Sequence, residues 1–282
     1  MPAAFVLLWS TGFIGAKYGL PYAEPLTFLL IRFVLVTSIL CLVALVMKAP
    51  WPKSPAQVFH IVVAGLLIHA AYLGGVFVAI DLGLPAGTAA LITALQPLLT
   101  AVAAGPYLGE RITGRQWLGL TLGLAGVFLV VFEKLDPAQV NLYGVMWALF
   151  AVIGITVGTL YQKRHGGSMD VRTGSVIQFS ASALVLAVLA PLVEEMDVHW
   201  TGDFIFALGW LTFVLSLGAI SLLILMIRRG AASKVAGFFY MVPVVTALMA
   251  YFMFGETLTM VGVFGMLTTV IGVALAVRAT RS

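Results

Sequence analysis

One arginine stands inside an otherwise apolar stretch near the start of the chain. Arg32 falls within the run 26–47, shortly after Pro25. If this run crosses a membrane, a charge at its centre costs about 2.5–3.5 kcal/mol, and ionisable residues in such places usually have a function. The guanidinium would then hold the carboxylate of a small solute or form a gating ion pair with Glu24. The structural alternatives are a side chain that snorkels to the lipid headgroups or one that binds backbone carbonyls.

Three residues near the N-terminus are spaced to share one helix face. Trp9, Phe13 and Lys17 follow one another at intervals of four. An aromatic wall that ends in a cation suits a zwitterionic or aromatic ligand, through stacking and cation–π contact. The plain alternative is bundle packing, with Lys17 at the headgroups.

A polar stripe and two central prolines mark two further stretches. Thr93, Gln96, Pro97 and Thr100 recur at helical spacing in the run 87–108, and Pro243 has the same central place in 232–254. Lipid tolerates such a stripe poorly, so it should face the interior. Proline frees a backbone carbonyl, which is acceptable where it lines a cavity. We predict two kinked, cavity-lining and hinged helices, although proline is common in membrane helices generally.

Further aromatic and polar residues in the apolar runs are expected to complete a central chamber. His69 is the one histidine near the middle of a run, which makes it a candidate for proton coupling. A lone buried histidine is more often simply hydrogen-bonded, and the apolar runs carry no central Asp or Glu, which argues against proton antiport. The expected chamber residues are His69, Tyr72, Trp147, Gln178, Trp210, Phe213 and Tyr240.

The composition decides what kind of molecule must position these residues. Of 282 residues, 62% are hydrophobic and only 9% are charged, and the mean hydropathy is +1.11. So few charges cannot cover a water-soluble globule, which excludes a soluble enzyme, a nucleic-acid-binding domain and a disordered chain. The single cysteine, Cys41, allows no intramolecular disulfide. An all-α polytopic membrane protein remains.

Ten apolar stretches have the length of spanning helices, since a span needs about 20 residues. Their apolarity is continuous, as in Leu118 to Phe132, and does not alternate as in a transmembrane barrel. With the N-terminus in the cytoplasm, 12 of the 15 Lys and Arg residues fall on cytoplasmic segments. Both termini are therefore expected inside. The stretches are 3–20, 26–47, 57–80, 87–108, 114–132, 142–162, 171–193, 203–227, 232–254 and 259–277.

An internal repeat divides the chain into halves. Positions 97 and 243, both proline, are 146 residues apart, and the same offset pairs Glu110 with Glu256 and Lys17 with Lys163. We predict two five-helix repeats, residues 1–137 and 138–282. Because five is odd, the second is inverted in the membrane, as in many secondary transporters. Gln178 stands where the offset places Arg32, so the two half-sites differ chemically.

Glu110 and Glu256 each precede a turn, with Thr113 and Thr259 at the start of the next helix. We expect these glutamates to have a structural role, satisfying free amides at helix ends rather than binding substrate. Gly105/Gly109, Gly119/Gly123 and Gly154/Gly158 have the small-residue spacing that permits close helix packing.

These residues together resemble a known family. The first helix reads Leu8-Trp9-Ser10-Thr11-Gly12-Phe13, the fourth ends in Leu108-Gly109-Glu110-Arg111-Ile112-Thr113, and the second half repeats Pro243, Gly255-Glu256 and Leu258-Thr259. Over its whole length the chain is similar to EamA-type transporters of the drug/metabolite transporter superfamily. The resemblance implies ten helices in two EamA repeats. It also implies kinship with the YddG-like bacterial inner-membrane exporters of amino acids and related metabolites.

The sequence therefore predicts an inner-membrane secondary transporter that exports amino acids, including aromatic ones, by alternating access. Its partners would be the small-molecule substrate and the lipid bilayer, with no cofactor, metal or nucleic acid. The outward direction follows from the resemblance alone. The alternatives are multidrug efflux of lipophilic cations, a passive pore, a membrane scaffold and an intramembrane enzyme. No nucleophile–base pair, metal-ligand motif or ATP-binding loop supports enzymatic or ATP-driven activity.

Overall fold

The computed structural model describes residues 1–84, 86–132, 141–167, 169–230, 232–254 and 259–278. Within these ranges the chain is helical apart from short connections and one isolated bridge between Ala23 and Val198. Side chains just before helices satisfy several free amides, as when Ser54 Oγ accepts from Gln57 N. In chain order the elements are α1 Pro2–Gly19, η1 Leu20–Tyr22, α2 Pro25–Val46, α3 Pro55–Gly65, η2 Leu66–Ala71, α4 Tyr72–Asp81, α5 Ala86–Thr93, α6 Gln96–Leu108, α7 Gly114–Phe132, α8 Leu142–His165, α9 Val171–Val193, α10 Gly202–Trp210, η4 Leu211–Ala219, α11 Ile220–Arg229, α12 Ala232–Gly237, η5 Phe238–Tyr240, α13 Met241–Phe254 and α14 Met260–Arg278.

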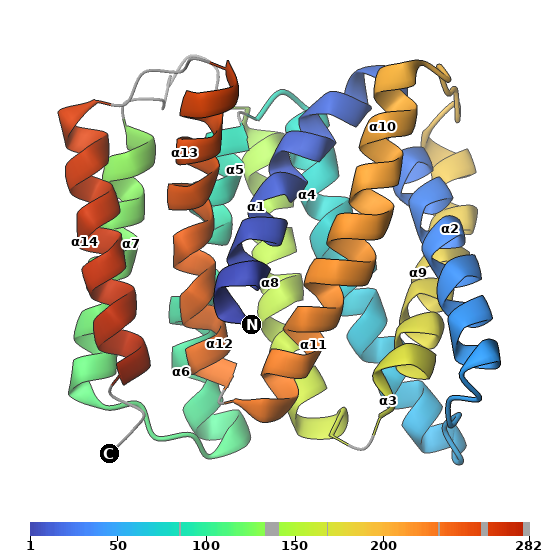
Figure 1. Ribbon diagram of the computed structural model, residues 1–282, viewed down its shortest axis with the longest axis horizontal. Coiled ribbons are helices and arrows are strands. Elements are labelled where there is room, and N and C mark those ends of the chain that lie inside the picture. The colour runs from blue at the N-terminus through green and yellow to red at the C-terminus, as the bar shows by residue number, and fades with distance from the viewer. Residues whose placement is uncertain (85, 133–140, 168, 231, 255–258, 279–282) are drawn as a thin grey trace.

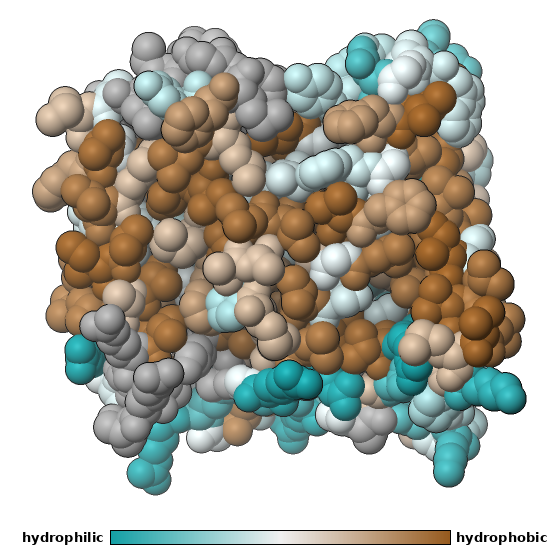
Figure 2. All heavy atoms as spheres, viewed as in Figure 1, coloured by the Kyte–Doolittle hydropathy of each residue, from teal (hydrophilic) through white to brown (hydrophobic). Residues whose placement is uncertain are grey.

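Several helical segments in the described part of the chain are long and apolar enough to cross a membrane, which agrees with the predicted all-α polytopic membrane protein, although fewer than the expected ten reach that length. Eight such segments occur in the described part of the chain, together with two shorter apolar helices, Gly114–Val130 and Val235–Met249. Their side chains match a lipid environment: Leu42, Val46 and Leu192 are largely exposed. Figure 2 shows a broad apolar band over the visible face, with strongly hydrophilic side chains gathered at its lower end.

Two helix pairs flank a central bundle (Figure 1). At one side α7 packs along α14, and at the other α2 packs along α9. Between them, α1 contacts η4 and α13, while α8 contacts α4, α6 and η2. Each of these contacts joins segments that are far apart in the sequence, so the core is built from both halves of the chain.

The α7–α14 pair depends on glycines that bring the two backbones together. A Cβ added at Gly119 would lie 2.5 Å from Ala276 N and 2.6 Å from Gly272 O, and one added at Gly265 would lie 2.7 Å from Gly126 O. No side chain fits at such distances, so the helices touch through their backbones. Close packing was predicted for three pairs of glycines. Neighbouring helices crowd Gly119, Gly123, Gly154 and Gly158, but a Cβ added at Gly105 would meet only Glu110 O, at an ordinary 3.5 Å. Gly109 has a different role: its φ of 72° ends α6 in the left-handed conformation.

Four of the central helices are interrupted near their middle. η2 and η4 are π-helical segments that interrupt α3–α4 and α10–α11. α5 ends at Thr93 before α6 begins at Gln96, and η5 separates α12 from α13. Pro97 and Pro243 lie in the first turn of the helix that follows each interruption, where proline fits.

Candidate functional site

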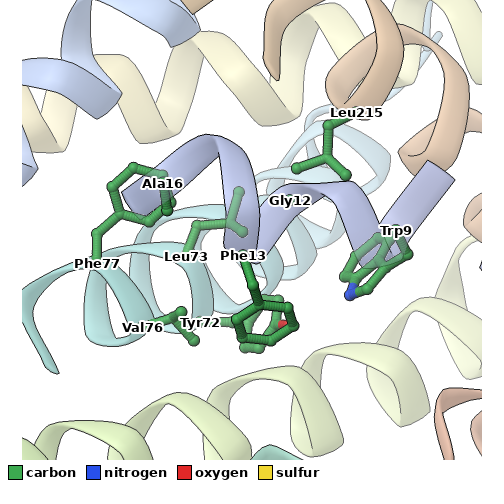
Figure 3. Close-up of a pocket in the computed structure, with 9 residues that line it drawn as sticks. All are labelled: Trp9, Gly12, Phe13, Ala16, Tyr72, Leu73, Val76, Phe77 and Leu215. Atoms are coloured by element: carbon green, nitrogen blue, oxygen red, sulfur yellow. The ribbon is translucent and has the colours of Figure 1, made fainter. Parts of the chain in front are cut away.

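A small pocket lies between α1, α4 and η4 (Figure 3). The lining side chains on each helix share one face, because residues four positions apart in a helix lie on the same side of it. Trp9 and Phe13 come from α1 and Tyr72 and Val76 from α4, while Leu215 closes one side from the second half of the chain. The remaining lining residues are Gly12, Ala16, Leu73 and Phe77.

The aromatic rings give this pocket a flat, rigid wall. Trp9 stacks with Tyr72, with ring centroids 6.1 Å apart and planes 18° from parallel. Trp9 is held from behind by Phe5 and Phe239, at centroid distances of 5.2 Å each. Such a wall can bind an apolar or aromatic group by stacking. Trp9 and Phe13 from the predicted helix face therefore meet the predicted chamber residue Tyr72 here.

The pocket is nearly closed in this conformation. Its cavity volume is about 20 Å³, enough for a single water molecule, whereas sites for organic ligands measure about 300–1,000 Å³. In this conformation the pocket is therefore too small to hold an organic metabolite. The π-helical segment η4 borders the pocket through Leu215.

The predicted polar stripe faces the protein interior. Gln96, Pro97 and Thr100 are buried, and Thr93 is half-buried with its hydroxyl donating to Ala90 O at 3.0 Å. Within the described ranges, neither the Gln96 amide nor the Thr100 hydroxyl has a hydrogen-bond partner. Buried polar groups normally have a hydrogen-bond partner. Because these atoms have none among the described residues, they can bind water or a ligand. They do not line the pocket of Figure 3.

A second polar cluster surrounds Arg32. This side chain is fully buried, and its Nε donates to Ser216 Oγ at 3.0 Å. His69 and Gln178 are also fully buried, and His69 lies near both the Arg32 charge and Gln178. The offset of 146 residues thus relates position 32 on α2 to position 178 on α9, and these two helices pack together. Glu24, the expected gating partner of Arg32, instead accepts from Met196 N at 2.8 Å.

Other expected chamber residues lie elsewhere. Trp147 and Phe213 are on the surface, with 42% and 60% of their area exposed. Trp210 is also exposed and donates from Nε1 to Thr11 Oγ1 at 2.9 Å. Tyr240 is buried against Gly123 in the cluster that joins α7 and α14. The Lys17 side chain and Glu256 lie outside the described residues.

Glu110, in the first half of the chain, stabilises the end of a helix that belongs to the second half. Its Oε1 accepts from Ala232 N, at the start of α12, at 2.7 Å. Thr113 Oγ1, in contrast, accepts locally from Gln116 N at 3.3 Å at the start of α7. Sequence reasoning missed a comparable contact: the Glu194 carboxylate accepts from the backbone amides of Leu26 and Thr27 at 2.7 and 2.8 Å. No local motif signals that pair, because the partners are far apart in the sequence.

The aromatic pocket, the polar stripe and the Arg32 cluster together provide aromatic faces, amides, hydroxyls, an imidazole and a guanidinium as binding groups. Across the described residues, no group of three or more His, Cys, Asp or Glu side chains gathers as metal ligands do. The arrangement is suited to holding a small amphipathic solute inside a membrane protein.

Comparison with known proteins agrees with this assessment. The chain is 28% identical to the transporter YvbV of Bacillus subtilis (strain 168), over 97% of this chain and 89% of that one. It is 26% identical to a protein of Escherichia coli (strain K12) named "Probable amino-acid metabolite efflux pump", over 98% and 93%. A solved crystal structure shares the fold, with a TM-score of 0.81 at 21% identity and coverage of 99% of this chain and 96% of that one.

The EamA-like transporter family matches the chain twice, over residues 3–132 and again over 142–278. These two matches cover nearly all of the sequence, and they agree with the helical bundle and its apolar exterior. The chain therefore belongs to the EamA-like transporter family and is a multi-pass membrane transporter.

Proposed function

We propose that this transporter exports small amphipathic metabolites, amino acids and aromatic amino acids among them, across a bacterial inner membrane by alternating access. The observation that carries the proposal is the aromatic pocket formed by Trp9, Phe13 and Tyr72 of the first half and bordered by Leu215 of the second half. The name of the Escherichia coli relative supports the substrate class.

Alternating access requires two related halves that can exchange conformations. The double family match supports repeats at residues 1–137 and 138–282. The helix bounds follow the same offset: α2 begins at 25 and α9 at 171, and α7 begins at 114 and α14 at 260. Each half also carries a π-helical segment at the corresponding place, η2 and η4. Five helices in each half would invert the second repeat, with both termini in the cytoplasm.

In this proposal the substrate's side chain stacks on Trp9 and Tyr72 once the pocket opens. The unpartnered amide of Gln96 is available to hydrogen-bond its polar end. The pocket favours neutral or zwitterionic solutes over lipophilic cations, since none of its lining side chains carries a negative charge.

Counterflow in proteoliposomes tests the proposal. Vesicles are preloaded with unlabelled phenylalanine, leucine, threonine or glutamate, and entry of a trace of the labelled amino acid is followed. Saturable entry that depends on the internal amino acid supports the carrier. A lipophilic cation and a nucleotide sugar serve as comparison solutes.

The other outcomes each contradict the proposal in a distinct way. Movement of the cation without amino acids would indicate multidrug efflux. Flux without saturation or counterflow would indicate a passive pore. No transport by folded protein would favour a scaffold or an intramembrane enzyme. Gln96→Leu should lower amino-acid counterflow, whereas Thr268→Val, a half-buried hydroxyl bound to its own helix at Phe264 O, should not.

A further inference from the structure

Arg32 is a charged group in the interior with few partners. Its side chain is fully buried on α2, and only Nε has a hydrogen bond, to Ser216 Oγ at 3.0 Å. Over the described part of the chain, Nη1 and Nη2 have no partner. A buried ion without a counter-charge is strongly unfavourable, so something must compensate these two nitrogens.

The described carboxylates do not provide that compensation. They lie at helix ends or in connections, and the two nearest to α2 have other partners. Glu24 accepts from Met196 N, and Glu194 accepts from the amides of Leu26 and Thr27. The ion pair formed in these ranges joins Arg172 to Asp170 instead.

The groups next to Arg32 add a further donor rather than an acid. The His69 ring stacks on Phe179, with centroids 4.1 Å apart, and neither of its nitrogens is hydrogen-bonded to a described residue. A neutral imidazole still carries one N–H. Gln178 donates from Nε2 to Gln162 Oε1 at 2.8 Å, and its own Oε1 is left without a partner in the same ranges. That oxygen can accept from His69 and orient the ring.

Four elements bring these groups together. Arg32 and Gln178 come from the packed pair α2 and α9, His69 comes from η2, and Ser216 comes from η4. η2 and η4 are both π-helical, a widened geometry that is frequent at functional sites. η4 also connects the cluster to the pocket, because Leu215 lines the pocket and the next residue accepts from Arg32.

We propose that Arg32 and His69, with Gln178 positioning the imidazole, form an intramembrane binding site for a small monovalent anion of the size of chloride or a carboxylate group. The guanidinium supplies two N–H groups and the charge, and the imidazole supplies a third donor. The carboxylate source rests on the proposed transport of amino acids, whereas the chloride source does not. Occupancy would act on the pocket through η4.

Thermal unfolding of the purified protein in detergent tests this site. The midpoint is measured in sodium chloride, sodium formate and sodium gluconate at one ionic strength, gluconate being too bulky for the site. We expect a saturable rise of about 2–4 °C over gluconate when the anion is well above its dissociation constant. A rise with chloride identifies an inorganic anion as sufficient. A rise with formate but not with chloride identifies a carboxylate site.

Matched variants locate the effect. Arg32→Gln should give one midpoint in all three salts, whereas Arg228→Gln, which changes an arginine bound to Gly167 O at 3.0 Å, should keep the full response. If Arg32→Gln does not fold, His69→Leu replaces it and should raise the half-saturating anion concentration several-fold. Equal wild-type midpoints in all salts, or a response that survives at Arg32→Gln, would overturn the site. Because the unfolding experiment measures no transport, its result for the anion site is independent of the counterflow result for the proposed function.

Discussion

Glu110 and Ala232 join the two halves of the chain at one end of the bundle. The Glu110 carboxylate accepts from the first amide of α12 at 2.7 Å. Close by in the chain, Lys163 Nζ donates to Gly230 O at 2.6 Å. The Glu110 contact therefore ties the end of α6 to the start of α12.

Removing the Glu110 carboxylate should therefore weaken the fold measurably. Glu110→Ala leaves the Ala232 amide without its acceptor, a loss of about 0.5–2 kcal/mol for a helix-capping contact. We expect the thermal midpoint of the purified protein to fall by a few degrees. Glu195→Ala, at an exposed position after α9, is the matched control and should leave the midpoint unchanged. Equal effects of the two variants would contradict a capping role for Glu110.

Substitution in the aromatic wall should change substrate affinity selectively. Trp9→Phe shortens the face that stacks with Tyr72, and we expect the half-saturating concentration of phenylalanine in counterflow to rise about tenfold, equivalent to about 1.4 kcal/mol. Trp147→Phe makes the same change on the exposed surface. It should leave the concentration dependence as in the wild type. An unchanged affinity in Trp9→Phe would remove this wall from the binding site.

Backbone packing of α7 against α14 should tolerate no added methyl group. In Gly119→Ala the new Cβ would lie 2.5 Å from Ala276 N and must push the helices apart, at a cost of about 1–3 kcal/mol. Gly209→Ala makes the same change in α10, where no atom lies within 4 Å of the added Cβ. We expect a lower thermal midpoint only for Gly119→Ala. A stable Gly119→Ala protein would mean that the two helices are not in backbone contact.

Acidification should remove one local contribution to stability. Asp170 caps α9, and hydrogen bonds from the Arg172 side chain lower the pKa of this carboxyl below its ordinary value of 3.8. The pKa of Asp170 is therefore lower in the folded protein than in the unfolded chain. The ionised carboxylate stabilises the fold fully at pH values above the unfolded-state pKa, and this stabilisation is lost as the pH falls through the folded-state pKa.

Asp170→Asn isolates this effect, since asparagine can still cap the helix but carries no charge. We expect the wild type to unfold at a higher temperature than the variant near pH 7, by a small margin because the pair is partly exposed. The margin should shrink below about pH 4. A margin that stays constant on acidification would show that the charge of Asp170 contributes nothing.

The sequence alone determined the class of the molecule and much of its organisation. Apolar stretches of spanning length predict helices, because backbone groups in lipid must pair within their own segment. That logic is local, and it placed the bounds of α2, α9, α7 and α14 within a few residues. Glycine spacing likewise predicted close packing at Gly119, since a missing side chain is itself visible in the sequence.

Tertiary structure decided which side chains meet. Trp9 and Trp147 look alike as residues in apolar helices, yet one lines a pocket and the other faces outward. A membrane helix is apolar on every side, so hydrophobic periodicity cannot tell its lipid face from its protein face. The pairing of Arg32 with Ser216, and of Glu110 with Ala232, joins residues more than 100 positions apart. Only the packing of the helices fixes such contacts, because no local pattern in the sequence encodes them.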